Sequence, residues 1–288
     1  MTTTPTLRLD GKVAVVTGGG RGLGRGIATG LAAQGASVVI NDLFREDDGT
    51  AAAELVAAEI RTAGGTAVAC LDNIASFDGG EAVVSAALDA FGRVDILVTC
   101  AGNFRRSLLL DLEEEEWDAV LPVHLTGTAG CVRAAARAMV AQGEGGRIVT
   151  VSSRGAFFGP QVAYSGAKAA IMGLSASAAV ELAPYGITVN CLLPSAMTQL
   201  FSSPATSRRF GGMPETLSMD PDQVATLVEF LASPAAGEIT GRFLYAAGTD
   251  LCVYAEPLQL AGATTFIRNA VPWQVDDLAG YLPGVLGA

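Results

Sequence analysis

Two hydrophobic patterns alternate along most of this chain. Short runs that are apolar at nearly every position are followed by longer Ala-rich stretches in which apolar residues recur with helical spacing. Unbroken apolar runs are expected of strands that are covered on both faces. They predict strands at 12–17, 37–41, 66–71, 94–99, 147–151, 187–192 and 242–246, and the stretches between them predict helices at 22–34, 50–63, 77–91, 113–142, 163–184 and 221–232.

This alternation predicts βαβ units with right-handed crossovers. We therefore expect an α/β fold of the Rossmann type, a doubly wound parallel sheet of about seven strands with helices on both faces. No Ser/Pro-rich linker interrupts the series, which favours a single domain over 1–288 with its core at 8–250. The segment 199–220 is expected to be a substrate loop. The extension 254–288 either helps to shape a pocket or simply covers surface.

Composition narrows the possible partners and compartment. The net charge of −11 and a pI near 4.5 argue against nucleic acid or an anionic membrane as the main partner. No apolar run is long enough for a transmembrane helix, and the first residues lack the apolar core of a signal peptide. Five widely spaced cysteines are typical of reduced thiols, not of a disulfide framework or a metal site. We expect a cytoplasmic protein.

A glycine-rich turn, 17–24 (TGGGRGLG), follows the first predicted strand and opens the first predicted helix. Glycines let the backbone approach a pyrophosphate, and a helix N-terminus offers free N–H groups and a positive dipole. A glycine cluster alone is weak evidence, but its place inside a βαβ unit gives it force. The turn predicts a dinucleotide site that includes Gly18, Arg21, Gly22, Leu23 and Gly24.

An acidic residue, Asp42, ends the second predicted strand. A carboxylate there can accept hydrogen bonds from the adenosine ribose and repel a 2′-phosphate, which favours NAD over NADP. Arg21 points the other way, since a cation in the turn could pair with that phosphate. We expect the carboxylate to dominate because Arg21 can swing into solvent. The alternative is that Asp42 is an ordinary turn residue.

Tyr164 and Lys168 stand four residues apart in a predicted helix and therefore share one face. A cation beside a phenol favours the phenolate and lowers the pKa of the tyrosine. Basic residues in this chain are almost all arginine, and Lys12 is the other lysine. A packed tyrosine with a snorkelling lysine is the plain alternative.

Together these residues resemble the short-chain dehydrogenase/reductase family. The resemblance covers roughly 8–250 and is carried by Thr17-Gly18-x-x-x-Gly22-x-Gly24, Ser152-Ser153, Tyr164-x-x-x-Lys168 and Asn190-x-x-x-Pro194, in that order. Within the family, the stretches 39–43 (VINDL) and 123–127 (VHLTG) look similar to the dehydrogenase domain of peroxisomal multifunctional enzymes and to single-domain bacterial proteins.

The resemblance implies catalytic roles. Tyr164 would exchange a proton with the substrate oxygen, and Lys168 would hold the nicotinamide ribose and lower the pKa of Tyr164. Ser153 would hydrogen-bond the substrate oxygen, with Ser152 as the alternative. The remaining cofactor contacts would come from Asn73 and Ile74 in the 72–74 turn, from Cys100, Ala101 and Gly102, and from Pro194 and Thr198.

The chain departs from the family pattern at three places. Thr99-Cys100 stand where two asparagines are usual, so Cys100 cannot supply an amide's hydrogen bonds. His124, the only histidine, replaces the helical asparagine of the proton relay. It could hold the relay water or be structural. Ser153 and Tyr164 are closer in sequence than usual, which should reshape the pocket wall at Phe157, Phe158 and Pro160.

We therefore expect an NAD(H)-dependent oxidoreductase that interconverts a hydrophobic secondary alcohol and its ketone. One alternative is an NADPH-dependent 3-oxoacyl or polyketide-type ketoreductase. A second is a cofactor-binding scaffold without turnover, which the altered positions Thr99, Cys100 and His124 motivate. The family resemblance also implies a homo-oligomer, a tetramer. No metal is expected.

Overall fold

The computed structural model describes residues 8–105, 108–157, 161–196 and 218–254. Contacts within the chain divide it into two compact units, Met1–Val253 and Tyr254–Ala288. The first unit is described below. The predicted substrate loop lies outside the described residues except for 218–220, as does the extension except for Tyr254, so their roles stay predictions.

One sheet organises the first unit, and its strands are buried along most of their length. The spatial order is β3-β2-β1-β4-β5-β6-β7-β8. All neighbours are parallel except the last pair, which is antiparallel. The strands are β1 Val13–Thr17, β2 Ser37–Asn41, β3 Thr66–Cys70, β4 Ile96–Thr99, β5 Gly146–Val151, β6 Ile187–Pro194, β7 Phe243–Ala247 and β8 Asp250–Val253.

Helices connect the parallel strands, as the alternating pattern predicts. The helices of the described residues are α1 Gly22–Ala33, α2 Ala52–Thr62, α3 Phe77–Phe91, α4 Glu114–Leu121, α5 Gly127–Gln142, α6 Val162–Leu182 and α7 Pro221–Ala232. Short 3-10 turns lie at Leu109–Asp111, Arg154–Ala156, Ala183–Tyr185 and Pro234–Ala236, and a π-helical turn lies at Pro122–Thr126.

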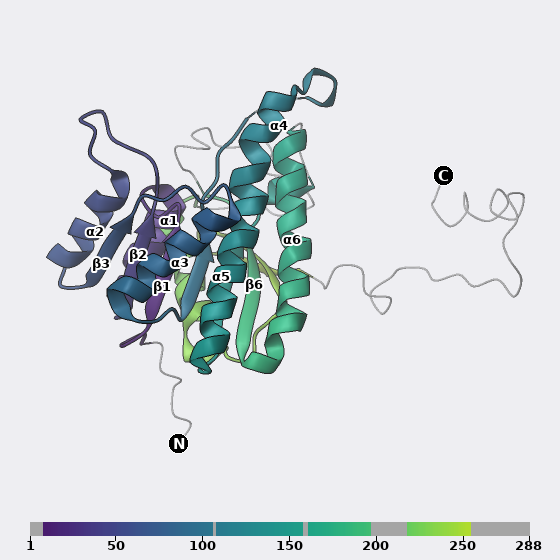
Figure 1. Cartoon of the computed structure of the whole chain (residues 1–288). Coiled ribbons are helices and arrows are strands. Elements are labelled where there is room, and N and C mark those ends of the chain that lie inside the picture. The colour runs from purple at the N-terminus through teal and green to yellow at the C-terminus, as the bar shows by residue number, and fades with distance from the viewer. Residues whose placement is uncertain (1–7, 106–107, 158–160, 197–217, 255–288) are drawn as a thin grey trace, which may run out of the picture. The chain divides into compact units, whose positions relative to one another are not determined.

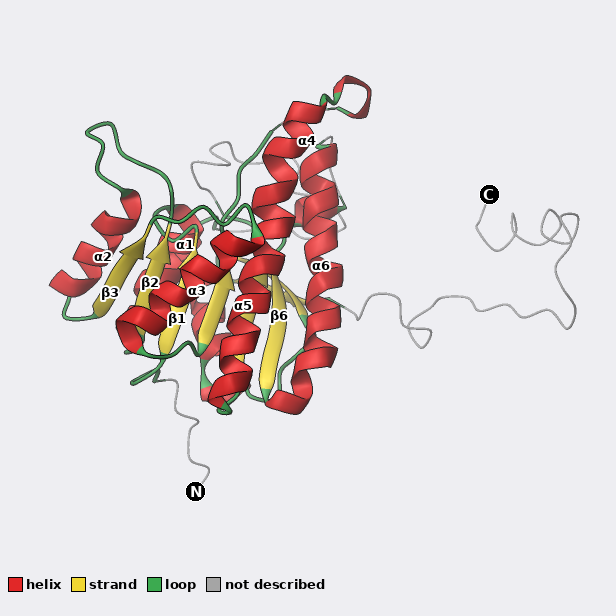
Figure 2. Ribbon diagram, viewed as in Figure 1, coloured by secondary structure: helices red, strands yellow, loops and turns green. Residues whose placement is uncertain are grey.

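Successive strand residues face opposite sides of the sheet and build two separate cores. In β1, Val13 and Val15 pack into a core with α3, α5 and α6, while Ala14 and Val16 pack into a core with α1, α2 and α7. Figure 1 and Figure 2 show α3, α5 and α6 lying across the near face of the sheet. The α/β architecture, the parallel sheet and the helices on both faces are thus confirmed.

The sheet has one strand more than the seven segments named from the sequence. β8 pairs with β7 at the edge of the sheet, and only Gly248, with a φ of 53°, and Thr249 separate them. Its residues alternate between half-buried and exposed, as suits an edge strand with one covered face.

The single helix predicted at 113–142 is interrupted by the π-helical turn. Pro122 has no N–H to continue the regular ladder, and the N–H of Gly127 instead bonds the Pro122 carbonyl, five residues back. Such turns are frequent at functional sites because they displace the side chains they carry. Here the turn carries His124, which is buried.

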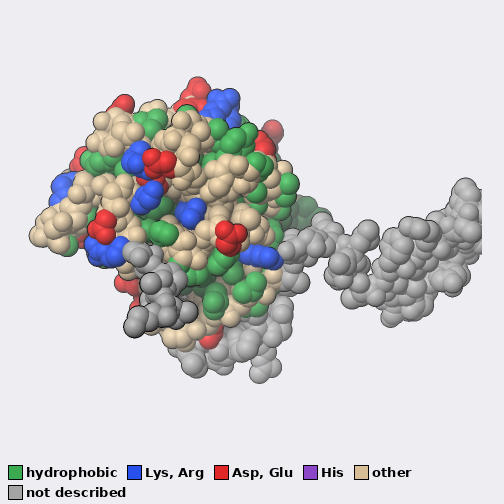
Figure 3. Space-filling view, turned by 90° about the horizontal axis from the view of Figure 1, so that it is seen from below, with side chains coloured by type: hydrophobic (Ala, Val, Ile, Leu, Met, Phe, Trp, Pro, Cys, Tyr) green, Lys and Arg blue, Asp and Glu red, His purple; other side chains and the backbone are tan. Residues whose placement is uncertain are grey.

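The end of the sheet where the strands begin is held by charges. Asp95 is buried and accepts hydrogen bonds from the Val13 N–H, from Lys12 and from Arg93. Viewed from below, the molecule shows acidic and basic side chains interspersed among polar and apolar ones (Figure 3). Lys12 is therefore committed to the opposite end of the sheet from the strand C-termini, where Lys168 lies.

Candidate active site

A cleft of about 570 Å³ opens at the carboxyl ends of the parallel strands. It lies around the point where the strand order reverses, between β1 and β4, which is the usual ligand site of open α/β sheets. Of the residues predicted for the site, the cleft is lined by Gly18, Arg21, Leu23, Gly24, Asp42, Asn73, Ile74, Cys100, Ala101, Gly102, His124, Ser153, Tyr164, Lys168 and Pro194. Gly22 begins α1 beside this lining, and Thr198 lies outside the described residues.

The glycine turn packs so closely against its own backbone that two of its positions have no space for a side chain. Gly18 has a φ of 66°, and a Cβ there would lie 2.6 Å from the Ala101 Cα. A Cβ on Gly24 would lie 2.0 Å from the Gly18 carbonyl oxygen. No side-chain cap bonds the first N–H groups of α1. The turn therefore fits a pyrophosphate, which free N–H groups at a helix N-terminus bind well.

The Asp42 carboxylate is fixed at the edge of this turn. One oxygen accepts the N–H of Gly20 at 3.0 Å, and the other accepts the N–H of Phe44 at 2.9 Å. Asn41 steadies the neighbouring turn by donating to the carbonyl oxygens of Cys70 and Asp72. Asp42 is consequently in position for a ribose at the end of β2.

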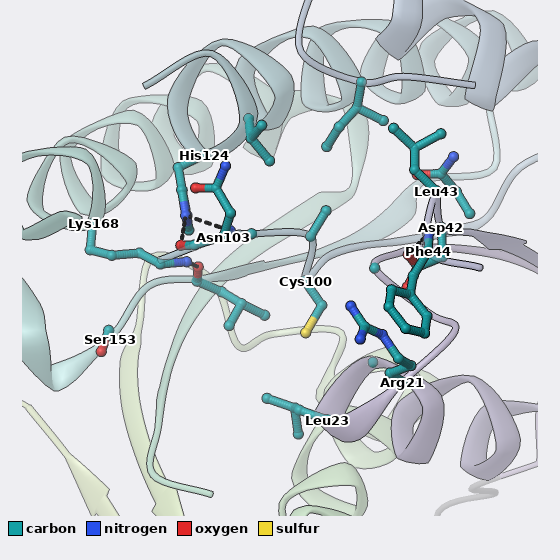
Figure 4. Close-up of a pocket in the computed structure, with 18 of the residues that line it drawn as sticks. Arg21, Leu23, Asp42, Leu43, Phe44, Cys100, Asn103, His124, Ser153 and Lys168 are labelled. Carbon is teal, nitrogen blue, oxygen red and sulfur yellow. Dashed lines mark hydrogen bonds between the residues drawn. The ribbon is translucent and has the colours of Figure 1, made fainter. Parts of the chain in front are cut away.

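Arg21, which the sequence left able to swing into solvent, lies against the Phe44 ring. Its guanidinium carbon lies 3.3 Å from the centre of the Phe44 ring, and the side chain is half-buried. Its Nε is buried, without a hydrogen-bond partner in the described part of the chain. Figure 4 shows Arg21 directed at the Phe44 ring. Phe44 lines the cleft as well, and no sequence motif pointed to it.

Tyr164 and Lys168 are both buried on the face of α6 that looks into the cleft. The Lys168 Nζ donates to the Val151 carbonyl oxygen at 2.7 Å and lies 5.7 Å from the centre of the Tyr164 ring. The predicted shared face is therefore present. Lys168 reaches past the tyrosine ring to the end of β5.

Burial sets the pKa values of this pair. It raises the pKa of Tyr164 to about 12, although a hydrogen bond with Ser153 opposes the rise. It lowers the pKa of Lys168 to about 8, opposed by the nearby thiols of Cys100 and Cys191. The pKa of Tyr164 is therefore raised, where the sequence led us to expect a lowering by Lys168, because desolvation of the phenolate is the largest effect on it.

The two adjacent serines have different partners. The Ser152 hydroxyl is buried and donates to the Lys168 carbonyl oxygen at 2.7 Å, which ties β5 to α6. The Ser153 hydroxyl accepts the Gly155 N–H at 3.0 Å and hydrogen-bonds Tyr164. Both serines line the cleft, but Ser153 is the one that hydrogen-bonds the phenol, which supports choosing it over Ser152.

His124 packs edge-on against Tyr164, with ring centres 5.4 Å apart and ring planes at 84°. Its Nε2 faces both the N–H of Asn103, at 3.0 Å, and the carbonyl oxygen of Asn103, at 2.7 Å (Figure 4). Burial and the Lys168 charge lower the pKa of His124 to about 3, so the ring is neutral. Its Nδ1 is buried and finds no hydrogen-bond partner among the described residues.

Asn103 lines the cleft directly after Gly102 and lies outside the sequence motifs. Its side-chain amide donates to the Ala119 carbonyl oxygen of α4 at 2.6 Å. It therefore ties the loop after β4 to the helix that leads into the His124 turn.

Cys100 lines the cleft in place of an amide, and burial raises the pKa of its thiol to about 11. The neighbouring Thr99 hydroxyl is buried without a partner. The pocket wall expected at Phe157 has an exposed phenyl ring, while Phe158 and Pro160 lie outside the described residues.

Two features that the described residues lack bear on other functions. No group of His, Cys, Asp or Glu in the described part of the chain could hold a metal ion. None of the helices seen in this part of the chain has the length and apolar character needed to cross a membrane.

Several known proteins are similar to this chain in sequence and in fold. A family model described as short chain dehydrogenase matches residues 12–207. A hydroxyacyl-CoA dehydrogenase of Mycobacterium tuberculosis is 38% identical, over 97% of this chain and 90% of its own length. The mouse peroxisomal multifunctional enzyme type 2 is 38% identical over 84% of this chain, which matches 32% of that longer enzyme.

Two solved structures agree with this result. A short chain dehydrogenase from Mycobacterium avium has a TM-score of 0.83 and 35% identity, covering 97% of this chain and 95% of its own. A short chain dehydrogenase from Burkholderia cenocepacia in complex with NADP has a TM-score of 0.75 and 36% identity, covering 84% of this chain and 98% of its own. The chain belongs to the short-chain dehydrogenase/reductase family.

Proposed function

We propose that this oxidoreductase uses NAD(H) to interconvert a secondary alcohol and a ketone on a hydrophobic small molecule. One observation carries the proposal. The Tyr164 phenol, hydrogen-bonded to Ser153, lies in the same cleft as the glycine turn and Asp42. A proton-transfer group and a dinucleotide cradle thus share one cavity.

Each residue has a separate task in this proposal. The nicotinamide, when bound, supplies or accepts the hydride. Tyr164 holds a proton at neutral pH, since its pKa is near 12, and donates it to the substrate oxygen during reduction. Ser153 donates a hydrogen bond to the same oxygen and stabilises its developing charge. Lys168 is mostly protonated at pH 7, and its charge favours the phenolate that Tyr164 becomes after donation.

His124 is proposed as a positioning residue behind this pair. Its neutral ring packs against the Tyr164 ring and is held by the Asn103 backbone. The unpartnered Nδ1 can take one further hydrogen bond, as from a relay water. This is the task that an asparagine has in most of the family.

NAD is the proposed cofactor because Asp42 is fixed where the adenosine ribose would bind. A carboxylate accepts from the ribose hydroxyls and repels a 2′-phosphate. The NADP bound to the Burkholderia cenocepacia relative makes this proposal worth a direct test. Replacing Asp42 by Ala should shift the ratio of kcat/KM values toward NADP. An unchanged ratio would remove Asp42 from cofactor selection.

The second candidate function is that of an NADPH-dependent 3-oxoacyl or polyketide-type ketoreductase. Its substrate would be a ketone on an acyl thioester. It is favoured by the name of the hydroxyacyl-CoA dehydrogenase relative, which spans nearly the whole chain. Phe104 packs edge-on against Tyr164 with ring centres 5.4 Å apart, so an apolar side chain lies beside the phenol for either substrate. Apolar walls of this kind discriminate weakly between hydrophobic ligands.

The test is a panel assay of the purified protein. Simple secondary alcohols and 3-hydroxyacyl thioesters are offered with NAD and, separately, with NADP, and formation of reduced nicotinamide is followed by its absorbance. Turnover of alcohols with NAD supports the first candidate, and turnover of thioesters with NADP supports the second. Tight dinucleotide binding with no turnover across the panel would refute both and favour a scaffold. We also propose that the protein is cytoplasmic. The family resemblance further suggests a homotetramer.

A further inference from the structure

Arg21 and Asp42 are neighbours in the cleft lining, yet they form no ion pair in the part of the chain that the structure describes. Arg21 lies instead against the ring of Phe44, with its guanidinium carbon 3.3 Å from the ring centre (Figure 4). A cation over an aromatic face is attracted by the ring quadrupole. Phe44 therefore competes for the one basic side chain of the glycine turn.

The same phenylalanine also takes part in fixing the carboxylate. Its N–H donates to one Asp42 oxygen at 2.9 Å, and the Gly20 N–H donates to the other at 3.0 Å. Both bonds come from neutral amides, so they orient Asp42 without cancelling its charge. The ribose edge of the cleft thus keeps a full negative charge while Arg21 is held beside it.

The hold on Arg21 restricts what the guanidinium can reach. Its Nε is buried and has no hydrogen-bond partner among the residues that the structure describes. One of the two edges that a guanidinium offers for bidentate binding of a phosphate is therefore withdrawn. The stacking face is occupied by the Phe44 ring.

We propose that Phe44 selects the cofactor by holding Arg21 away from Asp42 and from the 2′-phosphate position, and so favours NAD over NADP. This inference rests on the proposed function, because it assumes that the cleft binds a nicotinamide dinucleotide. Phe44 is a positioning residue here, since it acts through Arg21. Removing its ring frees Arg21 either to neutralise Asp42 or to meet the phosphate, and both outcomes strengthen binding of NADP.

The expected effect follows from the strength of the contact that is lost. An exposed cation–π pair contributes about 0.5–1 kcal/mol, which corresponds to about a two- to five-fold change in a dissociation constant. Phe44→Ala should therefore lower the Kd for NADP about two- to five-fold and leave the Kd for NAD nearly unchanged. Phe44→Trp keeps an aromatic face and should behave like the parent protein.

The experiment is isothermal titration of the full chain with NAD and with NADP, without substrate. Phe77→Ala is the matched control. The Phe77 ring is about as exposed as that of Phe44, and its centre lies 4.8 Å from the guanidinium carbon of Arg133. Phe77 does not line the cleft. This control variant should change neither Kd. In Phe44→Ala, the steady-state KM values for the two cofactors should shift in parallel with the Kd values.

A cycle with Arg21→Ala isolates the proposed route. In that background the further change Phe44→Ala should have no effect on the NADP-to-NAD ratio. An unchanged ratio in Phe44→Ala alone, a weaker NADP affinity, or an equal shift in the Arg21→Ala background would each overturn the inference while leaving the proposed function intact. Failure of the parent protein to bind either dinucleotide would instead refute the proposed function.

Discussion

Acid should destabilise this protein through its one histidine. His124 is almost fully buried and has a pKa of about 3, well below the ordinary value of 6.5. In the unfolded chain the imidazole takes up a proton as the pH falls below 6.5, whereas the folded state resists it. The stabilising contribution is thus present above pH 6.5 and is lost progressively as the pH falls toward 3.

The size of the effect follows from the shift. One pKa unit corresponds to about 1.36 kcal/mol, so the free energy of unfolding should fall by about 2 kcal/mol between neutral pH and about pH 5 on account of His124 alone. Urea unfolding of the parent protein and of His124→Asn at both pH values isolates this term, since every other titrating group is shared.

Two outcomes would refute this reasoning. One is an equal loss of stability in the parent and in His124→Asn on acidification. The other would come from NMR of the imidazole ring, whose signal is unambiguous because the chain has a single histidine. A resonance that titrates near the ordinary value of 6.5 would mean that burial and Lys168 do not hold the ring neutral.

Other predictions concern packing and charge. Gly102→Ala should raise the KM for cofactor, because a Cβ there would lie 2.5 Å from the His124 ring and disturb the site. Gly166→Ala is the control, because Gly166 lies in α6 with open space around it. This control should raise the free energy of unfolding by about 0.5–1 kcal/mol, measured by thermal unfolding. Asp95→Ala should lower the free energy of unfolding by about 3 kcal/mol in urea titrations, since it leaves buried donors and the Arg93 charge without their acceptor; a loss below 1 kcal/mol would contradict this.

Local patterns were sufficient to predict most of the fold. Strand and helix positions follow from periodicity, because a covered strand and an amphipathic helix impose different spacings on apolar residues. β8 was missed because it is short and alternates like surface, although the two-residue connection Gly248-Thr249 is typical of a hairpin. The π-helical turn at Pro122–Thr126 was missed because apolar spacing barely changes across it.

Site features that depend on residues near each other in sequence could be predicted. Contacts between segments far apart in the sequence could not. Tyr164 and Lys168 are neighbours in sequence, so their shared face could be predicted, but the burial that governs their pKa values depends on the whole fold. Arg21 follows β1 and Phe44 follows β2, and neither loop contains a sequence pattern that predicts their contact.

The central claim is that Tyr164 transfers the proton in a cleft that binds a nicotinamide dinucleotide. Tyr164→Phe removes the hydroxyl and keeps the ring that packs against His124 and Phe104. The decisive measurement is turnover and dinucleotide affinity in this one variant, on a substrate that the parent protein uses. We predict that kcat falls at least about 100-fold while the Kd for NAD stays within about twofold of the parent value. Undiminished turnover in Tyr164→Phe would contradict the account.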